Sequence, residues 1–272
     1  MPDAAKKSLQ AVIFDWAGTT VDHGSLAPVR TLQRVFAQRD IAVPDEVARR
    51  DMGLAKIDHI RKLLAEPEVL SIWKDLYGRN PREADVEDLY ADFIPLQMSC
   101  LLDYSKLIDG VADTVKQLRA RNIRIGGTTG YTRPMLEQLL TSAAAQGYRP
   151  DQSLCPDDVG AGRPHPYMCY RLAIDLRVYP MSACVKIGDT QSDIAEGLNA
   201  GMWTIGITRT GNMVGLSESD WLALPSAEQA RILARAKALL QSSGAHYVAA
   251  SVAECLPILY EIEGRIERGE RP

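Results

Sequence analysis

The carboxylate of Asp15 opens the segment 15–20, which reads DWAGTT and directly follows the apolar stretch 11–14. Such a stretch is typical of a buried strand, and open α/β sheets place their chemistry at the carboxyl ends of parallel strands. Many enzymes that transfer phosphoryl groups carry a second Asp two residues further on, which protonates an oxygen leaving group. Here that position holds Ala17. If Asp15 is a nucleophile, its reaction therefore needs no carboxylic acid to protonate the group that leaves.

Two more polar segments follow predicted strands. The segment 127–132 reads GTTGYT and offers hydroxyl and backbone N–H groups at the start of a predicted helix, which suits phosphate oxygens. The segment 162–166 reads GRPHP and places Arg163 beside another helix start. Because a guanidinium group can bind an anion through two N–H groups, both segments indicate an anion-binding site.

A fourth segment, 188–193, reads GDTQSD and follows the predicted strand 184–187. Its carboxylates Asp189 and Asp193 stand one helical turn apart. Together with Asp15 they form a candidate set of ligands for a hard cation. Mg²⁺ fits this set because it takes few carboxylates, keeps several waters and binds substrate phosphates.

Each segment has a simpler explanation when it is considered alone. An Asp after a strand is often the N-cap of the next helix. The threonines at 128 and 129 are compatible with an ordinary turn, Arg163 with a solvated surface cation, and Asp193 with a structural role even if Asp189 binds metal. All four segments in this order, each after a predicted strand, are much harder to explain as caps.

Composition limits the possible classes of protein. A chain of 272 residues accommodates one large domain or a domain with an insertion. The net charge of −4 without a basic stripe predicts no nucleic-acid partner, and no apolar stretch approaches membrane-spanning length. No signal peptide is visible in the first ten residues. Cysteines without CxxC spacing predict free thiols in a reducing cytoplasm, and there are five: Cys100, Cys155, Cys169, Cys184 and Cys255.

Predicted strands and helices alternate along most of the chain, as in a parallel sheet with crossover helices. The strands are expected at 11–14, 123–127, 153–155, 184–187, 203–207 and 246–249. Helices are expected at 111–120, 133–146, 166–176, 192–200 and 226–240. The last of these helices is expected to begin with a capping box formed by Ser226 and Gln229.

The stretch from 26 to 102 interrupts this alternation. Apolar residues recur there at helical spacing in three places and no strand is convincing. We therefore predict an α/β fold with a Rossmann-like parallel-sheet core and an inserted all-helical cap. The expected core is 1–24 and 103–272, and the expected cap is 25–102. Asp22 and His23, and 103–105 on the other side, are expected to be linkers rather than catalytic residues.

The four segments together resemble the haloacid dehalogenase superfamily of phosphotransferases with an aspartate nucleophile, over essentially the whole chain. The resemblance implies a core of the haloacid dehalogenase type with its cap inserted after the first segment. It also implies that Asp15 is the nucleophile and that Asp189 is a metal ligand supported by the acid Asp193. The implied phosphate ligands are Thr129, Gly130 and Arg163.

Within that superfamily the segments FDWAGTTVD at 14–22, MGLAKIDH at 52–59, TTGYTR at 128–133 and AGRP at 161–164 resemble the phosphonoacetaldehyde hydrolase, or phosphonatase, family. The resemblance implies that Ala17 supplies only its backbone carbonyl to Mg²⁺. It implies that Lys56, in the cap, forms a Schiff base with phosphonoacetaldehyde. A homodimer is likewise implied by the family alone.

Lys56 and His59 can also be judged from their surroundings in the sequence. A lone lysine in a helix is usually solvated. The apolar neighbours Met52, Leu54 and Ile57 would nevertheless help to lower the pKa of Lys56 once the cap closes over it. His59 lies three residues further on, on the same face of the helix, so it is a candidate for proton transfer. A buried structural histidine is the equal alternative.

Breaking a carbon–phosphorus bond explains why Ala17 and Lys56 occur together. A bare carbanion is a poor leaving group, but a protonated imine one carbon away accepts the bonding electrons as an enamine. The sequence thus predicts hydrolysis of phosphonoacetaldehyde through a lysine Schiff base and an aspartyl phosphate. Two alternatives stay open: a phosphatase or phosphomutase acting on phosphate esters, against which Ala17 counts, and a non-catalytic protein that binds a phosphorylated metabolite.

Overall fold

The computed structural model describes residues 8–272. In this part of the chain six parallel strands form one sheet, in the order β3-β2-β1-β4-β5-β6. The strands are β1 (Ala11–Phe14), β2 (Arg124–Thr128), β3 (Gln152–Leu154), β4 (Cys184–Gly188), β5 (Trp203–Ile207) and β6 (Tyr247–Ala249). This order puts β1 in the centre, next to the point where the strand order reverses, which is where such sheets bind ligands.

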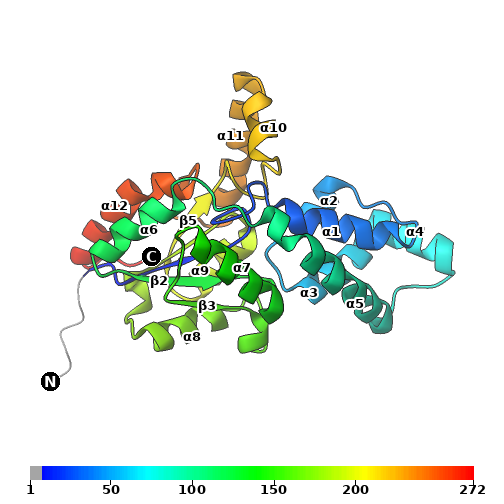
Figure 1. Cartoon of the computed structure of the whole chain (residues 1–272), viewed down its shortest axis with the longest axis horizontal. Coiled ribbons are helices and arrows are strands. Elements are labelled where there is room, and N and C mark those ends of the chain that lie inside the picture. The colour runs from blue at the N-terminus through cyan, green and yellow to red at the C-terminus, as the bar shows by residue number, and fades with distance from the viewer. Residues whose placement is uncertain (1–7) are drawn as a thin grey trace.

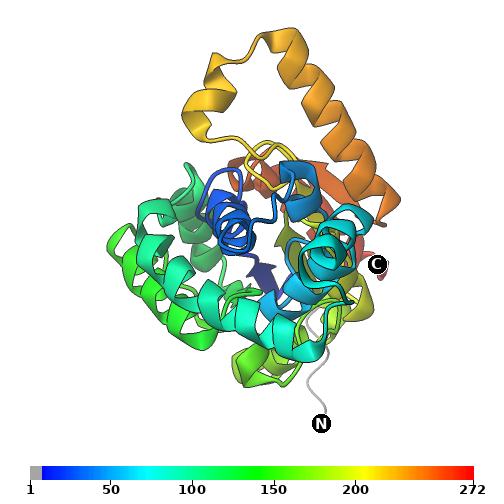
Figure 2. The same ribbon diagram turned by 90° about the vertical axis from the view of Figure 1, so that its right-hand side faces the viewer.

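Helices connect the strands on both faces of the sheet (Figure 1). They are α6 (Val111–Ala120), α7 (Arg133–Ala145), α8 (Tyr167–Leu176), α9 (Gln191–Asn199), α10 (Glu218–Ala223), α11 (Ser226–Ser242) and α12 (Cys255–Glu267). The pair α10 and α11 projects away from the rest of the molecule (Figure 2).

Strand β1 is buried on both faces because its side chains alternate between two apolar clusters. Ala11 and Ile13 belong to one cluster, together with residues of α8. Val12 and Phe14 belong to the other, together with residues of α6, α7 and α12. This burial explains why β1 is a continuous apolar stretch in the sequence and why the first polar side chain, Asp15, comes directly at its end.

Five helices between β1 and β2 form the inserted cap, at one end of the sheet (Figure 1). They are α1 (Leu26–Ala37), α2 (Asp45–Arg50), α3 (Lys56–Ala65), α4 (Pro67–Tyr77) and α5 (Glu83–Cys100). The longest of them, α5, packs against both α1 and α3. The apolar faces of these helices bury one another, which is why a stretch without strands still folds. The boundaries at 24/25 and 102/103 remain a prediction.

Asp22 lies in the first linker and supports the start of the cap. Its carboxylate oxygens accept the backbone N–H groups of Leu26 and Ala27, each at 3.0 Å. Burial raises the pKa of Asp22 to about 7, although these two N–H donors oppose that rise. The carboxylate therefore satisfies donors in the first turn of α1, which is a structural role.

The predicted strands and helices are largely confirmed. β1 and β5 have the expected bounds, and each of the other four strands is found within one residue of its predicted position. The capping box predicted at Ser226 and Gln229 is wrong. Pro225 is the N-cap of α11, and the Gln229 amide donates instead to the Trp221 carbonyl at 2.8 Å. Helices α2, α4, α10 and α12 were not predicted.

Two smaller expectations can be compared with the structure. All five cysteines are free thiols, and four of them are buried. Among residues 8–272, no helix has the length and apolar character needed to cross a lipid bilayer.

Candidate active site

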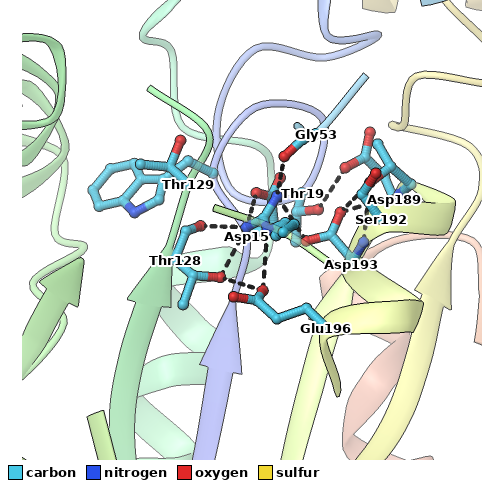
Figure 3. Close-up of polar contacts among 12 residues, drawn as sticks. Asp15, Thr19, Gly53, Thr128, Thr129, Asp189, Ser192, Asp193 and Glu196 are labelled. Atoms are coloured by element: carbon cyan, nitrogen blue, oxygen red, sulfur yellow. Dashed lines mark hydrogen bonds and ion pairs between the residues drawn. The ribbon is translucent and has the colours of Figure 1, made fainter. Parts of the chain in front are cut away.

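Three predicted segments meet at one edge of the sheet because of the strand register. Phe14, the last residue of β1, pairs with Gly127 of β2 on one side and with Ile187 of β4 on the other. The residues that follow each strand therefore emerge side by side. Figure 3 shows Asp15 between Thr128 and Asp189 at this edge.

Three carboxylates gather there as a candidate metal site. Asp15, Asp189 and Asp193 are buried, and each offers an oxygen within 4.8 Å of the others. Asp193 is already engaged on both oxygens. Its Oδ1 accepts from Lys186 at 2.8 Å and pairs with Arg163 at 3.0 Å, while its Oδ2 accepts the Thr190 hydroxyl at 2.6 Å. Asp193 therefore has a supporting role beside the candidate metal site.

Both Asp15 and Asp189 have raised pKa values. Burial raises the pKa of Asp15, and Asp193 raises it further. Burial, with Asp15 and then Asp193, raises the pKa of Asp189 well above its usual value. A cation between the two carboxylates would stabilise their charged forms. No hydrogen bond within residues 8–272 uses the Ala17 carbonyl, and Ala17 lines the same cavity as Asp15. Two carboxylates and a carbonyl oxygen fit Mg²⁺.

Arg163 connects Asp15 to two other buried acids. Its guanidinium group is buried and contacts Asp15 Oδ1 at 2.7 Å, Asp193 Oδ1 at 3.0 Å and Glu196 Oε2 at 2.9 Å. Burial alone would lower the pKa of Arg163, but the surrounding carboxylates, led by Asp193, raise it well above its usual value. The cation is thus fixed directly beside Asp15.

Sequence reasoning missed two residues of this network, Lys186 and Glu196, and it assigned the Thr128 hydroxyl to phosphate binding rather than to the bond with Glu196. Lys186 lies in β4 with no exposed surface and donates to Asp193. Glu196 accepts from Arg163 and from the Thr128 hydroxyl, both at 2.9 Å. Two signals could have revealed them: a lysine inside a buried apolar strand, and an acid three residues after Asp193 on the same helix face.

The predicted phosphate segment lies where core and cap touch. The Thr129 hydroxyl accepts the backbone N–H of Tyr131 at 3.1 Å. Gly130 lies directly under the cap, because a Cβ built on it would stand 2.3 Å from the Leu54 carbonyl oxygen. Thr129, Gly130 and Arg163 line the same cavity as Asp15, so the structure brings the predicted phosphate ligands together with the predicted nucleophile.

Lys56 reaches into this cavity from the start of α3. Its ammonium group lies 3.6 Å from the Met52 sulfur and 5.5 Å from the centre of the Tyr131 ring. Within residues 8–272 it makes no ion pair. Burial lowers the pKa of Lys56 to about 8, although Asp15 acts in the opposite direction. About a tenth of the amine is therefore neutral at pH 7, far more than for a lysine with its usual pKa, and a nucleophilic lysine requires the neutral form.

His59 lies one turn further along α3 and is fully buried. Neither ring nitrogen has a hydrogen-bond partner among residues 8–272. Burial lowers the pKa of His59 well below its usual value, and the charge of Lys56 adds to this effect. The imidazole is therefore neutral, with one nitrogen able to donate and the other to accept a proton.

The cap is closed over the site. The cavity has a volume of about 20 Å³, room for little more than one water molecule. Its lining residues come from core and cap: Asp15, Ala17, Ser25, Pro28, Met52, Gly53, Lys56, Thr129, Gly130, Tyr131, Arg163 and Thr190. Because a substrate with a phosphoryl group does not fit, the cap must open for it to enter.

Comparisons with known proteins agree with this geometry. A family model described as haloacid dehalogenase-like hydrolase matches residues 9–201. The chain is 46% identical over 264 residues to a phosphonoacetaldehyde hydrolase of Syntrophobacter fumaroxidans, covering 97% of this chain and 95% of the relative. It is 45% identical over 266 residues to one of Paraburkholderia xenovorans, covering 98% and 100%. A solved structure of a phosphonoacetaldehyde hydrolase-like protein from Oleispira antarctica has a TM-score of 0.95 and 40% identity, with full coverage of both chains.

The contact at Gly130 generates a first prediction. In Gly130→Ala the new methyl group would collide with the Leu54 carbonyl and push the cap loop outward. Amide hydrogen exchange of the segment 51–56, followed by mass spectrometry, should become at least about fivefold faster, since overpacking a close contact costs about 1–3 kcal/mol. Gly264→Ala is the control, because a Cβ there is 3.5 Å from its nearest neighbour. Unchanged exchange in Gly130→Ala would show that this contact does not hold the cap.

Proposed function

The chain belongs to the phosphonoacetaldehyde hydrolase family of the haloacid dehalogenase-like hydrolases, and we propose that it hydrolyses the carbon–phosphorus bond of phosphonoacetaldehyde to acetaldehyde and phosphate. The observation that carries the proposal is the pairing of two features in one closed cavity. The buried amine of Lys56 faces the same space as the carboxylate of Asp15, and the position that would hold an acid for an oxygen leaving group is Ala17.

The first half of the proposed reaction takes place at Lys56. Its neutral amine adds to the aldehyde carbon, water leaves, and the nitrogen takes up a proton to give a protonated imine. Asp15 then attacks phosphorus in line. The carbon–phosphorus bond breaks as the aspartyl phosphate forms, and its electron pair moves into the imine system to give an enamine. No proton needs to be delivered to the leaving atom at this moment, which is consistent with Ala17.

The second half releases both products. The enamine is protonated on carbon, and water hydrolyses the resulting imine to acetaldehyde and the free amine of Lys56. A second water hydrolyses the aspartyl phosphate and restores the carboxylate of Asp15. His59 is proposed to transfer a proton in one of these steps, because its neutral ring has two unpartnered nitrogens close to the lysine.

The remaining residues bind and orient the phosphoryl group. Arg163 is proposed to bind its oxygens, since the guanidinium group is held 2.7 Å from the nucleophile. The hydroxyl and backbone groups of Thr129 and Gly130 are proposed to complete the cradle. Mg²⁺ would be held by the carboxylates of Asp15 and Asp189 and the carbonyl of Ala17, and it supplies charge neutralisation for the phosphoryl oxygens. Asp193 is proposed to orient these ligands.

Two further proposals come from the family rather than from the site. We propose that the chain forms a homodimer and acts in the cytoplasm. Size-exclusion chromatography with light scattering tests the first, and the second is supported by the five free thiols.

A product assay tests the function directly. With phosphonoacetaldehyde and MgCl₂, acetaldehyde and inorganic phosphate should appear in equal amounts. Faster turnover of phosphate monoesters than of phosphonoacetaldehyde would instead favour a phosphatase or phosphomutase. Binding of Mg²⁺ without release of phosphate from either substrate would favour a non-catalytic binding protein.

Replacing the nucleophile gives a second prediction. Asp15→Asn is nearly isosteric, so the fold should survive, while nucleophilic attack on phosphorus is lost. The rate should fall at least about 10³-fold, equivalent to about 4 kcal/mol of barrier. The control is Asp92→Asn, a half-exposed carboxylate in the cap paired with Arg39. Near-normal turnover of phosphonoacetaldehyde by Asp15→Asn would remove this residue from the mechanism.

Position 17 gives a third prediction. Ala17→Asp places a carboxylate beside Asp15 and the proposed metal ligands, so it should reduce turnover of phosphonoacetaldehyde by about 10²-fold, the cost of displacing a positioned group by about 1 Å. Ala17→Asn is the control, because it separates the effect of volume from that of charge. Turnover by Ala17→Asp equal to that of the wild type would mean that the alanine is incidental.

Lys56 gives a fourth prediction, which combines trapping with pH. Borohydride added with acetaldehyde should inactivate the enzyme and leave an ethyl adduct on Lys56, found by peptide mapping. Because the amine must be neutral to attack, kcat/KM should rise about tenfold per pH unit below pH 8 and level off above it.

The matched variants for Lys56 are two arginine substitutions in the same helix. Lys56→Arg keeps the charge but forms no imine, so it should be nearly inactive and should escape trapping. Lys62→Arg should behave as the wild type, because Lys62 is exposed and pairs with Asp51. An active Lys56→Arg enzyme, or adducts on other lysines only, would contradict the Schiff-base assignment.

A further inference from the structure

The loop 210–216, which follows β5, contacts the segments after β1 and β4, the first linker and helix α2 of the cap; we call it the relay loop. The Thr210 hydroxyl donates to the Gly18 carbonyl at 2.8 Å, next to Ala17. The Thr210 carbonyl accepts the Gly24 N–H at 2.7 Å, in the first linker. The Leu216 carbonyl lies 2.9 Å from His23 Nδ1 in the same linker. The relay loop therefore touches both the nucleophile segment and the linker to the cap.

At one end the relay loop holds the proposed metal ligand Asp189. The backbone N–H of Asn212 donates to Asp189 Oδ2 at 2.7 Å. The loop can approach Asp189 this closely because residue 211 is glycine. A Cβ on residue 211 would stand 2.5 Å from the Cβ of Asp189. A displacement of Asn212 would therefore change the direction in which this carboxylate oxygen is held.

At the other end the relay loop holds Arg49, which belongs to helix α2 of the cap. The Arg49 side chain is only 10% exposed. It donates to the Gly24 carbonyl at 2.9 Å, to Asn212 Oδ1 at 3.2 Å and to the Gly215 carbonyl at 3.1 Å. The Asn212 amide donates back to the Arg49 carbonyl at 2.9 Å.

The fit between arginine and loop again depends on a glycine. A Cβ on Gly215 would stand 2.7 Å from the guanidinium carbon of Arg49. The only carboxylate paired with Arg49 among residues 8–272 is Asp45, which lies in the same helix and is 60% exposed. Most acceptors of this buried cation thus belong to the core and the linker, and they are lost when the cap moves away.

We propose that Asn212 couples closure of the cap to the metal-binding edge of the site, with Arg49 as the positioning residue on the cap. When the cap is closed, Arg49 fixes the Asn212 side chain, and the Asn212 N–H fixes Asp189 Oδ2 for a cation. Opening the cap releases both. Because coupling between two sites is reciprocal, binding of a cation at Asp189 favours the closed cap to the same extent. The inference uses the proposed function only in assigning Mg²⁺ to Asp189.

The proposal makes Arg49 and Asn212 part of metal binding although neither would touch the metal. Titration of the substrate-free protein with MgCl₂, followed by calorimetry, measures this directly. Arg49→Met and Asn212→Ala should weaken Mg²⁺ binding by about 5- to 150-fold, the usual range of coupling between sites. Arg50→Met is the matched control on the same helix, since Arg50 is half exposed and pairs with Glu66, and its Mg²⁺ affinity should equal that of the wild type.

Hydrogen exchange of the segment 45–56 gives the second readout. In the wild type MgCl₂ should slow this exchange, and in both variants it should have no effect. If Arg49 only stabilises the contact between cap and core, the variants will show faster exchange with unchanged Mg²⁺ affinity. That result would overturn the proposal. Asn212→Ala keeps the backbone N–H and carries the test if Arg49→Met does not fold. Neither readout uses phosphonoacetaldehyde, so failure of the proposed substrate would leave both results interpretable.

Discussion

A cluster of carboxylates is buried at the carboxyl edge of the sheet, and the structure depends on the cations that neutralise their charge. Asp15, Asp189, Asp193 and Glu196 are all nearly without exposed surface. Arg163 pairs with three of them, and Lys186 contacts two. Burial of an unpaired charge is costly, and removing one partner of a buried pair typically costs about 3–5 kcal/mol. The same network that satisfies these charges also holds the proposed nucleophile and the proposed phosphate-binding cation in contact.

Closure of the cap completes this electrostatic arrangement. It leaves a cavity of only about 20 Å³, and burial lowers the pKa of Lys56 to about 8. The same burial raises the pKa values of Asp15 and Asp189. One physical cause, the removal of solvent, therefore favours both a cation between the acids and a neutral amine opposite the proposed nucleophile. The relay loop 210–216 connects both effects, because it contacts Asp189 at one end and the cap residue Arg49 at the other.

Local signals in the sequence predicted most of the fold and the positions of the predicted site residues. Buried parallel strands are short and continuously apolar, so β1 and β5 were predicted with their observed bounds. Amphipathic spacing indicated an all-helical insertion. Local signals failed where contacts from outside a helix determine how that helix begins. Ser226 and Gln229 have capping-box spacing, yet Gln229 bonds to Trp221 and Pro225 takes the N-cap position.

By itself the sequence determined which chemical groups stand at the ends of the strands, because strand ends and their polar neighbours are local features. Asp15, Thr129 and Asp189 were predicted this way. Only the tertiary structure decided how these groups are satisfied. Lys186, Glu196 and Asn212 meet the site from three different elements, namely β4, α9 and the loop after β5. Their partners are chosen by the register of the sheet and by the docking of the cap, which no local pattern encodes.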